Sequence, residues 1–246
     1  MTICIEKDYE AMSKAAAEML LGAVKENPEV VLGLATGSTP IGMYQEVVKA
    51  YERGEADFSK VVSYNLDEYY PIAHDNDQSY HYFMKETLFK HINIDMANTH
   101  VPSGETVDVA KTAEEYDRAI YEIGGVDLQV LGIGNNGHIG FNEPAEVFAK
   151  GTGLVDLTES TISANSRFFA SIDDVPKKAV SMGIATIMQA KQIMLMASGK
   201  GKAEIIEKTI FGEITPEVPA SALQLHRNVT FFLDEEAAAE IVKKIK

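Results

Sequence analysis

Cysteine is almost absent from this chain, since Cys4 is the single example among 246 residues. One cysteine cannot form a disulfide within the chain or build a cysteine-based zinc site. The spacing H-E-x-x-H, which marks many zinc enzymes, does not occur either. The sequence therefore predicts neither a metal site nor a covalent staple, and it suits a reducing compartment.

Basic residues are also scarce: 22 lysines and arginines stand against 37 acidic residues and leave a formal net charge of −15. Nonspecific binding to nucleic acid depends on basic side chains that neutralise phosphates, so this charge argues against it. The same charge argues against binding to an anionic membrane surface. A single pocket in an acidic protein can still be locally basic, so a small anionic ligand is not excluded.

Long hydrophobic runs are missing as well. The longest apolar runs have the length of a strand, far below the ~20 residues that a membrane-spanning helix needs. The first residues carry acidic side chains from Glu6 onward and show no signal-peptide pattern. We expect a soluble, cytoplasmic protein, and 246 residues are an ordinary length for one α/β domain.

The pattern that is present alternates short apolar runs with stretches of helical periodicity. Runs that are apolar on both faces are typical of buried parallel strands. They lie at Thr2–Ile5, Val30–Ala35, Val61–Asn65, Leu128–Gly132, Ile193–Ala197 and Val229–Leu233. Helices are predicted at Tyr9–Glu26, Thr39–Arg53, Gln78–Lys90, Val107–Ile123, Thr158–Ser166, Lys200–Thr209 and Asp234–Ile245. The alternation predicts a mostly parallel sheet flanked by helices, in which ligands bind beyond the carboxyl ends of the strands.

The predicted strand Val30–Ala35 is followed by the small-residue segment Thr36–Pro40, which leads into a predicted helix. Free backbone N–H groups at a helix N-terminus favour an anion, and Ser38 and Thr39 add hydroxyl donors. A tight turn with a Ser/Thr cap is the alternative. The Gly-Lys-Ser/Thr sequence of the nucleotide P-loop is missing.

Two adjacent carboxylates, Asp67 and Glu68, follow the next strand among aromatic residues. One interpretation is a solvated acidic turn. The other is that one carboxylate faces the ligand crevice and acts as a general base. Because neighbouring residues of an extended chain point in opposite directions, only one of the two is expected to do so.

The most informative loop follows the strand at Leu128–Gly132. Its glycines match G-x-G-x-x-G, but Gly140 and Pro144 interrupt the helix that a dinucleotide site requires, so we reject that interpretation. Histidine is a residue type suited to proton transfer, which makes His138 a candidate, and Glu143 is near enough in sequence to orient it. A purely structural histidine is the alternative.

Two basic residues complete the candidate site. Arg167 follows the polar helical stretch Thr158–Ser166, and Lys202 lies between a strand and a helix in Ser-Gly-Lys-Gly-Lys. A lone basic residue usually faces solvent, so the alternative for each is an exposed side chain that binds no ligand.

Together these segments resemble the motifs of the glucosamine-6-phosphate deaminase family. The motifs lie at Leu34–Pro40, Asn65–Tyr69, Gly132–Pro144, Asn165–Phe169 and Leu223–His226, in the family's order and across nearly the whole chain. The segment GHIGFNEP at 137–144 is the specific one, because the related 6-phosphogluconolactonases continue differently after Gly-His. The resemblance implies a single-domain, Rossmann-like α/β fold.

The resemblance also implies an activity and roles for particular residues. Glucosamine 6-phosphate and water would become fructose 6-phosphate and ammonia, without a metal or an organic cofactor. Asp67 would act as the base of the isomerisation. His138, supported by Glu143 and Asn136, would open the sugar ring. Phosphate contacts would fall on Gly37, Ser38, Thr39, Arg167 and Lys202.

Two departures from the family pattern affect this expectation. Position 136 is Asn where some members carry Asp, so Asn136 can hydrogen-bond the imidazole but cannot stabilise its cation by charge. The allosteric, hexameric members carry a basic effector segment, and its key positions are Gly153 and Val155 here. We therefore expect the smaller, non-allosteric type, a monomer or small homo-oligomer, with a lid over about 151–176.

Three functional hypotheses follow. The first is the deaminase, with glucosamine 6-phosphate as its small-molecule substrate. A sugar-phosphate lactonase or isomerase on the same fold is a second enzyme. A sugar-phosphate sensor without catalysis is the third.

Overall fold

Two sheets organise the chain, and the computed structural model describes residues 1–166, 169 and 171–245. Within these residues the larger sheet has seven parallel strands in the order β1-β10-β9-β6-β2-β3-β5. They are β1 (Thr2–Glu6), β2 (Val31–Leu34), β3 (Val62–Asn65), β5 (Thr99–His100), β6 (Leu128–Leu131), β9 (Gln192–Ala197) and β10 (Val229–Asp234). The predicted parallel sheet is confirmed, and every predicted strand belongs to it.

A smaller antiparallel sheet, in the order β4-β8-β7, was not expected. Its strands are β4 (Asp67–Tyr70), β7 (Gly153–Asp156) and β8 (Lys178–Ser181). Each is only four residues long and pairs with a segment distant in sequence. Leu66 joins the two sheets, because its N–H donates to Leu34 O (3.1 Å) and its carbonyl accepts from Met182 N (2.8 Å). The chain therefore passes directly from the large sheet into the small one.

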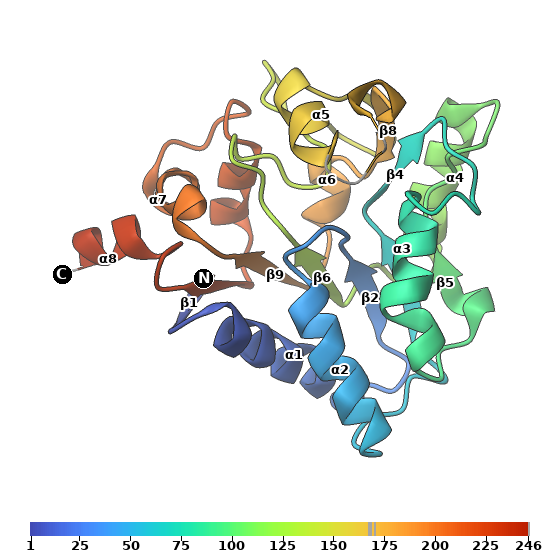
Figure 1. The fold of residues 1–246 in the computed structure, drawn as a ribbon, viewed down its shortest axis with the longest axis horizontal. Helices are drawn as coiled ribbons and strands as arrows, with labels where there is room; N and C mark the ends of the chain where they lie inside the picture. Colours follow the sequence, from blue (N-terminus) through green and yellow to red (C-terminus); the bar gives the residue numbers. More distant parts are fainter. Residues whose placement is uncertain (167–168, 170, 246) are drawn as a thin grey trace.

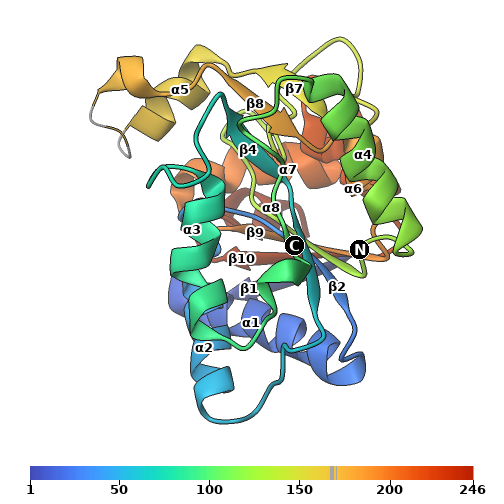
Figure 2. The same ribbon diagram turned by 90° about the vertical axis from the view of Figure 1, so that its right-hand side faces the viewer.

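Helices cover both faces of the large sheet. They are α1 (Tyr9–Glu26), α2 (Ile41–Glu52), α3 (Tyr80–Thr87), α4 (Val109–Glu122), α5 (Glu159–Asn165), α6 (Ile184–Ile187), α7 (Ala203–Phe211) and α8 (Ala239–Ile245). Figures 1 and 2 show α1 and α2 on one side of the sheet and α6 and α7 on the other. Among the described residues, no helix combines the length and apolar character needed to cross a bilayer.

Side-chain caps begin several of these helices. The carboxylate of Asp8 accepts a hydrogen bond from Ala11 N (2.8 Å) at the start of α1, and Asp108 accepts one from Lys111 N (3.1 Å) at the start of α4. Each bond satisfies a first-turn N–H that has no partner within the helix. As a result α1 has the predicted bounds, and α4 begins just after its cap.

The predicted helix at Asp234–Ile245 is wrong at its start. Asp234 instead extends β10, where it pairs with Glu6 of β1. Its carboxylate accepts hydrogen bonds from Ser198 Oγ (2.5 Å) and Gly199 N (2.9 Å), so it is committed to the turn after β9. The helix α8 therefore starts only at Ala239.

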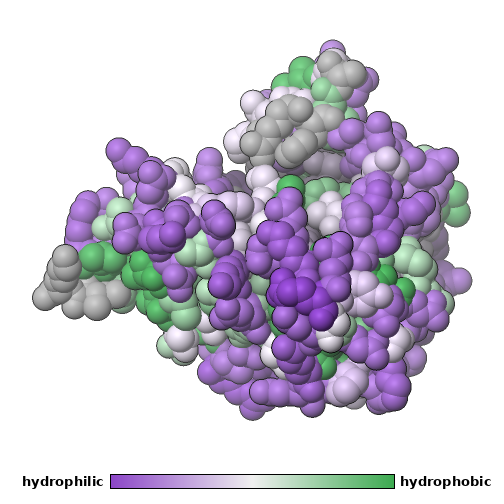
Figure 3. Space-filling view, turned by 60° about the horizontal axis from the view of Figure 1, so that its bottom comes forward, coloured by the Kyte–Doolittle hydropathy of each residue, from purple (hydrophilic) through white to green (hydrophobic). Residues whose placement is uncertain are grey.

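The apolar faces of the outer helices point inward. In α1 the buried residues include Met12, Ala16 and Leu20, which recur at helical spacing. Figure 3 shows that the opposite, outward side of the molecule near α1 and α2 is covered mainly by hydrophilic side chains. The polar side chains of these helices thus stay in water while the apolar ones form the core.

Candidate active site

A cavity of about 530 Å³ opens where β2, β3 and β6 end. The strands β2 and β6 are neighbours, but the chain continues from β2 to β3 on one side and from β6 to β9 on the other. A crevice of this kind, beyond the carboxyl ends of strands that diverge, is where open α/β sheets bind ligands. The predicted site residues that line it are Gly37, Ser38, Thr39, Asp67, Asn136, His138 and Lys202.

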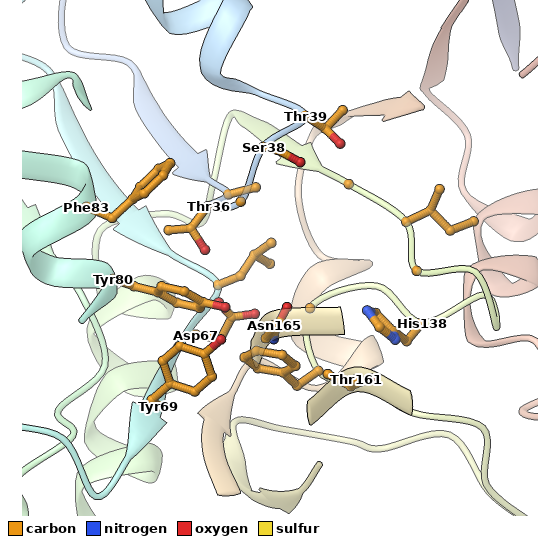
Figure 4. A pocket seen from close by; sticks show the side chains of 18 of the residues that line it. Thr36, Ser38, Thr39, Asp67, Tyr69, Tyr80, Phe83, His138, Thr161 and Asn165 are labelled. Carbon is orange, nitrogen blue, oxygen red and sulfur yellow. The ribbon is translucent and has the colours of Figure 1, made fainter. Parts of the chain in front are cut away.

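The loop between β2 and α2 forms one wall of the cavity (Figure 4). Gly37 has a φ of 88°, a conformation that glycine adopts without strain, and it turns the chain toward α2. Pro40 occupies the N-cap of α2 and supplies no side-chain cap. The N-terminal end of α2 and the hydroxyls of Ser38 and Thr39 thus lie at the cavity, as an anion site requires.

Asp67 is the first residue of β4 and lines the cavity, although only 6% of its surface is exposed. Burial, and the nearby charge of Glu68, raise the pKa of Asp67 to about 8. Its ionised form is therefore a stronger base than an ordinary carboxylate. In Figure 4 the Asp67 side chain lies beside the rings of Tyr69 and Tyr80.

Glu68 points away from the cavity, as the alternation of an extended chain predicts. Its carboxylate accepts hydrogen bonds from Tyr80 N (2.8 Å), His81 N (2.9 Å) and Tyr69 N (2.9 Å). Two of these donors belong to the first turn of α3. Burial raises the pKa of Glu68 to about 7, although the three N–H groups oppose the rise. Glu68 therefore fastens α3 to β4.

His138 lies on the side of the cavity opposite to Asp67 in Figure 4. Its Nδ1 is 3.2 Å from Oε2 of Glu143, which lies behind it and does not line the cavity. The same oxygen accepts a hydrogen bond from Asn136 Nδ2 at 2.6 Å. A histidine held by an ionised carboxylate can accept and return a proton, with its ring orientation fixed by that carboxylate.

Asn136 does not bond the imidazole among the described contacts, contrary to expectation. Its Oδ1 accepts from the backbone N–H of His138 (3.2 Å), a contact two residues on that is typical of an Asx turn. The tight loop thus directs Asn136 toward Glu143 and the backbone rather than toward the ring.

The second oxygen of Glu143 is held by α5 and the residue before it. Thr161 Oγ1 donates to Oε1 at 2.5 Å, and Thr158 Oγ1 donates at 3.2 Å. Burial alone would raise the pKa of Glu143. Hydrogen bonds from His138, Thr161 and Asn136, together with the charge of the imidazolium, instead lower it to about 2. Glu143 is therefore ionised throughout the neutral range.

Lys202 is oriented by the loop that carries His138. Its Nζ donates to Ile133 O and to Asn135 Oδ1, both at 2.7 Å. The ammonium group therefore reaches across the end of β6 to the cavity wall. Arg167, the other predicted basic residue, lies outside the described residues.

Several cavity residues were missed by sequence reasoning. They include Thr36, Tyr69, Tyr80, Phe83, Phe141, Thr161 and Asn165. The rings of Tyr80 and Phe141 stack with an interplanar angle of 11°, and Tyr69 packs against both. Tyr69 and Phe141 lie within two of the motif segments, but aromatic residues are typical of any core, so nothing in the sequence assigned these side chains to the cavity. Thr161 is recognisable only as part of a capped helix start.

The fold and the cavity define a class: a Rossmann-like α/β protein with a helix N-terminus, a buried carboxylate and a histidine–carboxylate pair around one cavity. The family model described as glucosamine-6-phosphate isomerases/6-phosphogluconolactonase matches residues 6–232. The chain belongs to this family.

Individual relatives agree with this assignment. A glucosamine-6-phosphate deaminase of Clostridium perfringens (strain SM101 / Type A) is 57% identical over 97% of this chain and 98% of its own length. The solved structure of a monomeric glucosamine-6-phosphate deaminase is 42% identical, with a TM-score of 0.95, over 98% of this chain and all of that one. A 6-phosphogluconolactonase from Trypanosoma brucei, 18% identical with a TM-score of 0.76 over 98% of each chain, shares the fold alone.

Proposed function

We propose that this protein is an enzyme that converts glucosamine 6-phosphate and water into fructose 6-phosphate and ammonia. The observation that carries the proposal is the placement of Asp67 and His138 on two sides of one cavity, below the loop that follows β2. An isomerisation coupled to ring opening needs two separate proton-transfer groups around one sugar. Relatives that share more than half of their residues with this chain are named glucosamine-6-phosphate deaminases.

The phosphate would anchor the sugar at the N-terminal end of α2. Gly37, Ser38 and Thr39 line this part of the cavity, and Lys202 brings a positive charge to it. At neutral pH a phosphate monoester carries most of two negative charges, which suits a helix terminus and an ammonium group. Arg167 completes the proposed phosphate set as a bidentate partner. Anchoring the remote phosphate holds C1 and C2 within reach of the proton-transfer groups.

His138 would open the pyranose ring. The O1 hydroxyl of the sugar loses its proton to the imidazole, and the ring oxygen gains a proton as its bond to C1 breaks. The imidazolium that forms between these transfers is stabilised by the ionised Glu143 at 3.2 Å. Asn136 keeps Glu143 in place but adds no charge of its own.

Asp67 would then carry out the isomerisation of the open chain. It removes the proton from C2 while the C1 oxygen gains a proton from the substrate's ammonium group, which gives an enolamine. Asp67 then returns its proton to C1, which turns the enolamine into a C2 iminium. Water adds to C2, ammonia leaves, and the C2 ketone of fructose 6-phosphate remains. Burial makes Asp67 a stronger base for this transfer, and a protonated substrate amine nearby would favour its ionised form.

We further propose that α5 is the moving part of a lid. Ser160, Thr161 and Asn165 of α5 line the cavity, while the preceding strand β7 is tied to β8 by a four-residue pairing. Within about 151–176, the part that moves would therefore be the one that follows β7. The lid would exclude water from Asp67 when closed, and its Thr161 holds Glu143 in the arrangement seen here.

We also propose a cytoplasmic, non-allosteric enzyme that works as a monomer or small homo-oligomer. The solved relative described as monomeric supports this assembly state. The lack of a basic residue at Gly153 and Val155 supports the absence of allostery. A hyperbolic rate curve, unchanged by N-acetylglucosamine 6-phosphate, is the expected result.

The deciding experiment supplies the purified protein with glucosamine 6-phosphate and measures ammonia and fructose 6-phosphate together. Equal amounts of both are expected, and Asp67→Asn should nearly abolish turnover while leaving substrate binding within a few-fold. Hydrolysis of 6-phosphogluconolactone without ammonia release would favour the lactonase. Binding without either reaction, measured by calorimetry, would favour the sensor and contradict the proposal.

A further inference from the structure

Tyr9 contacts the loop between β2 and α2 from outside the cavity. This tyrosine is the first residue of α1 and is 37% exposed. Its hydroxyl accepts a hydrogen bond from Gly42 N at 2.9 Å and donates to Thr39 O at 3.0 Å, with Ser38 O at 3.2 Å as the second acceptor. One side chain thus contacts the backbone on both sides of Pro40.

The start of α2 needs such a contact because its own residues do not cap it. Pro40 stands at the N-cap and makes no side-chain hydrogen bond there. The N–H groups of the first turn have no partner inside a helix, and the Tyr9 hydroxyl satisfies that of Gly42. The cap of α2 is therefore provided by the neighbouring helix.

The close approach of α1 and α2 depends on Gly42 lacking a side chain. A Cβ atom built on Gly42 would lie 2.5 Å from Ser13 Oγ and 3.0 Å from Cε1 of Tyr9. A larger residue would push the two helices apart and take the Tyr9 hydroxyl out of hydrogen-bond distance. The packing between the helices thus fixes where the hydroxyl lies.

The contact also sets the direction of a loop amide. The peptide between Ser38 and Thr39 is trans, so its N–H points opposite to its carbonyl. Because the Ser38 carbonyl faces the Tyr9 hydroxyl, the Thr39 N–H points away from Tyr9. Ser38 and Thr39 line the cavity, whereas Tyr9 does not. The loop therefore lies between Tyr9 and the proposed phosphate position.

We infer that Tyr9 is a positioning residue for phosphate binding, which holds the Gly37–Gly42 loop in its anion-binding conformation from the side opposite the ligand. The role rests on the proposed function, since the anion is the phosphate of the substrate. It acts through the loop and not on the reacting atoms, so it affects the binding of substrate more than the chemical steps.

The test compares Tyr9→Phe with the wild-type protein. The substitution keeps the ring and removes the hydroxyl. It should raise KM for glucosamine 6-phosphate about threefold to tenfold, the loss of a hydrogen bond of ordinary net strength, and leave kcat within about twofold. The Kd for inorganic phosphate, measured by calorimetry, should rise by a similar factor. Tyr121→Phe on α4, where the side chain is exposed and away from the cavity, is the matched control and should change neither quantity.

The outcomes separate this inference from the proposed function. If the wild-type protein releases ammonia but Tyr9→Phe leaves both KM and the phosphate Kd unchanged, the positioning role is wrong. A loss of kcat at constant KM would also overturn it. If the wild-type protein releases no ammonia but Tyr9→Phe still weakens phosphate binding, the role of Tyr9 stands and the deaminase proposal fails. Circular dichroism and a thermal melt check that the variant is folded.

Discussion

A Cβ atom built on Gly134 would lie 2.3 Å from Cε1 of His138. The imidazole therefore packs directly over the backbone of Gly134, and a hydrogen bond from Gly134 N to His138 O (2.9 Å) closes the same turn. Glycine is required here because the ring occupies the space that any side chain would fill. The Gly-rich loop thus leaves the space that the ring of His138, the proposed ring-opening residue, occupies.

Gly134→Ala should displace the His138 ring and reduce kcat about 100-fold, since a shift of roughly 1 Å can cost that much. The rate of ammonia release checks this. Gly22→Ala is a suitable control, because a Cβ there meets nothing within 4 Å, and alanine favours the interior of α1. A Gly134→Ala enzyme with wild-type kcat would contradict the packing described.

The pH dependence of the reaction should follow the ionisation of Asp67. Because the base must be ionised and burial raises the pKa of Asp67 to about 8, kcat/KM should rise with pH and level off above about 8. A profile that levels off near pH 5 would exclude Asp67 as the titrating base.

Asp67 should also make the protein less stable as the pH rises from about 4 to about 8. Its pKa in the folded state, about 8, lies above the value of about 3.9 in an unfolded chain, so the folded state holds this proton more tightly. The free energy of unfolding therefore falls as pH rises between these values. Asp67→Asn should remove this loss, and its advantage in Tm over wild type should widen between pH 5 and pH 9. A constant difference in Tm across that range would contradict this prediction.

Glu143→Gln should lower kcat about 100-fold, a loss typical for support of general acid–base catalysis. The amide carries no charge to stabilise the imidazolium and offers one acceptor oxygen where the carboxylate uses two. Because the pKa of Glu143 is lowered to about 2, the wild-type group is ionised at every working pH. The factor by which the substitution lowers kcat should therefore be the same from pH 5 to pH 9. Glu146→Gln, an exposed neighbour, should leave kcat unchanged.

Glu68→Ala should lower the free energy of unfolding of the protein. The substitution leaves three backbone N–H groups of β4 and α3 without their acceptor, at a cost of about 3 kcal/mol. Urea unfolding measures the difference. Glu18→Ala on the exposed face of α1 is the control, with an expected change within about 0.5 kcal/mol. Equal stability of the two variants would show that Glu68 does not fasten α3.

Local pattern was enough to predict the large sheet and the position of the cavity. The apolar runs form six of its seven described strands, all but the two-residue β5, and the polar segments after β2, β3 and β6 meet at one edge because parallel strands end on the same side. The small sheet was not predictable in this way. Its strands are short, and β4 and β7 each pair with β8, so their stability comes from distant partners.

The chain's own sequence determined that a carboxylate and a histidine would each follow the end of a buried parallel strand, and that only one of Asp67 and Glu68 would face the crevice. Alternation along a strand is a local property, so residue order decides it. Only the tertiary structure decided that Asp67 is the one that lines the cavity, that Asn136 bonds Glu143, and that Tyr9 caps α2. Each of these depends on which segments pack together, and so do burial and pKa, because solvation and hydrogen bonding are set by neighbours distant in sequence.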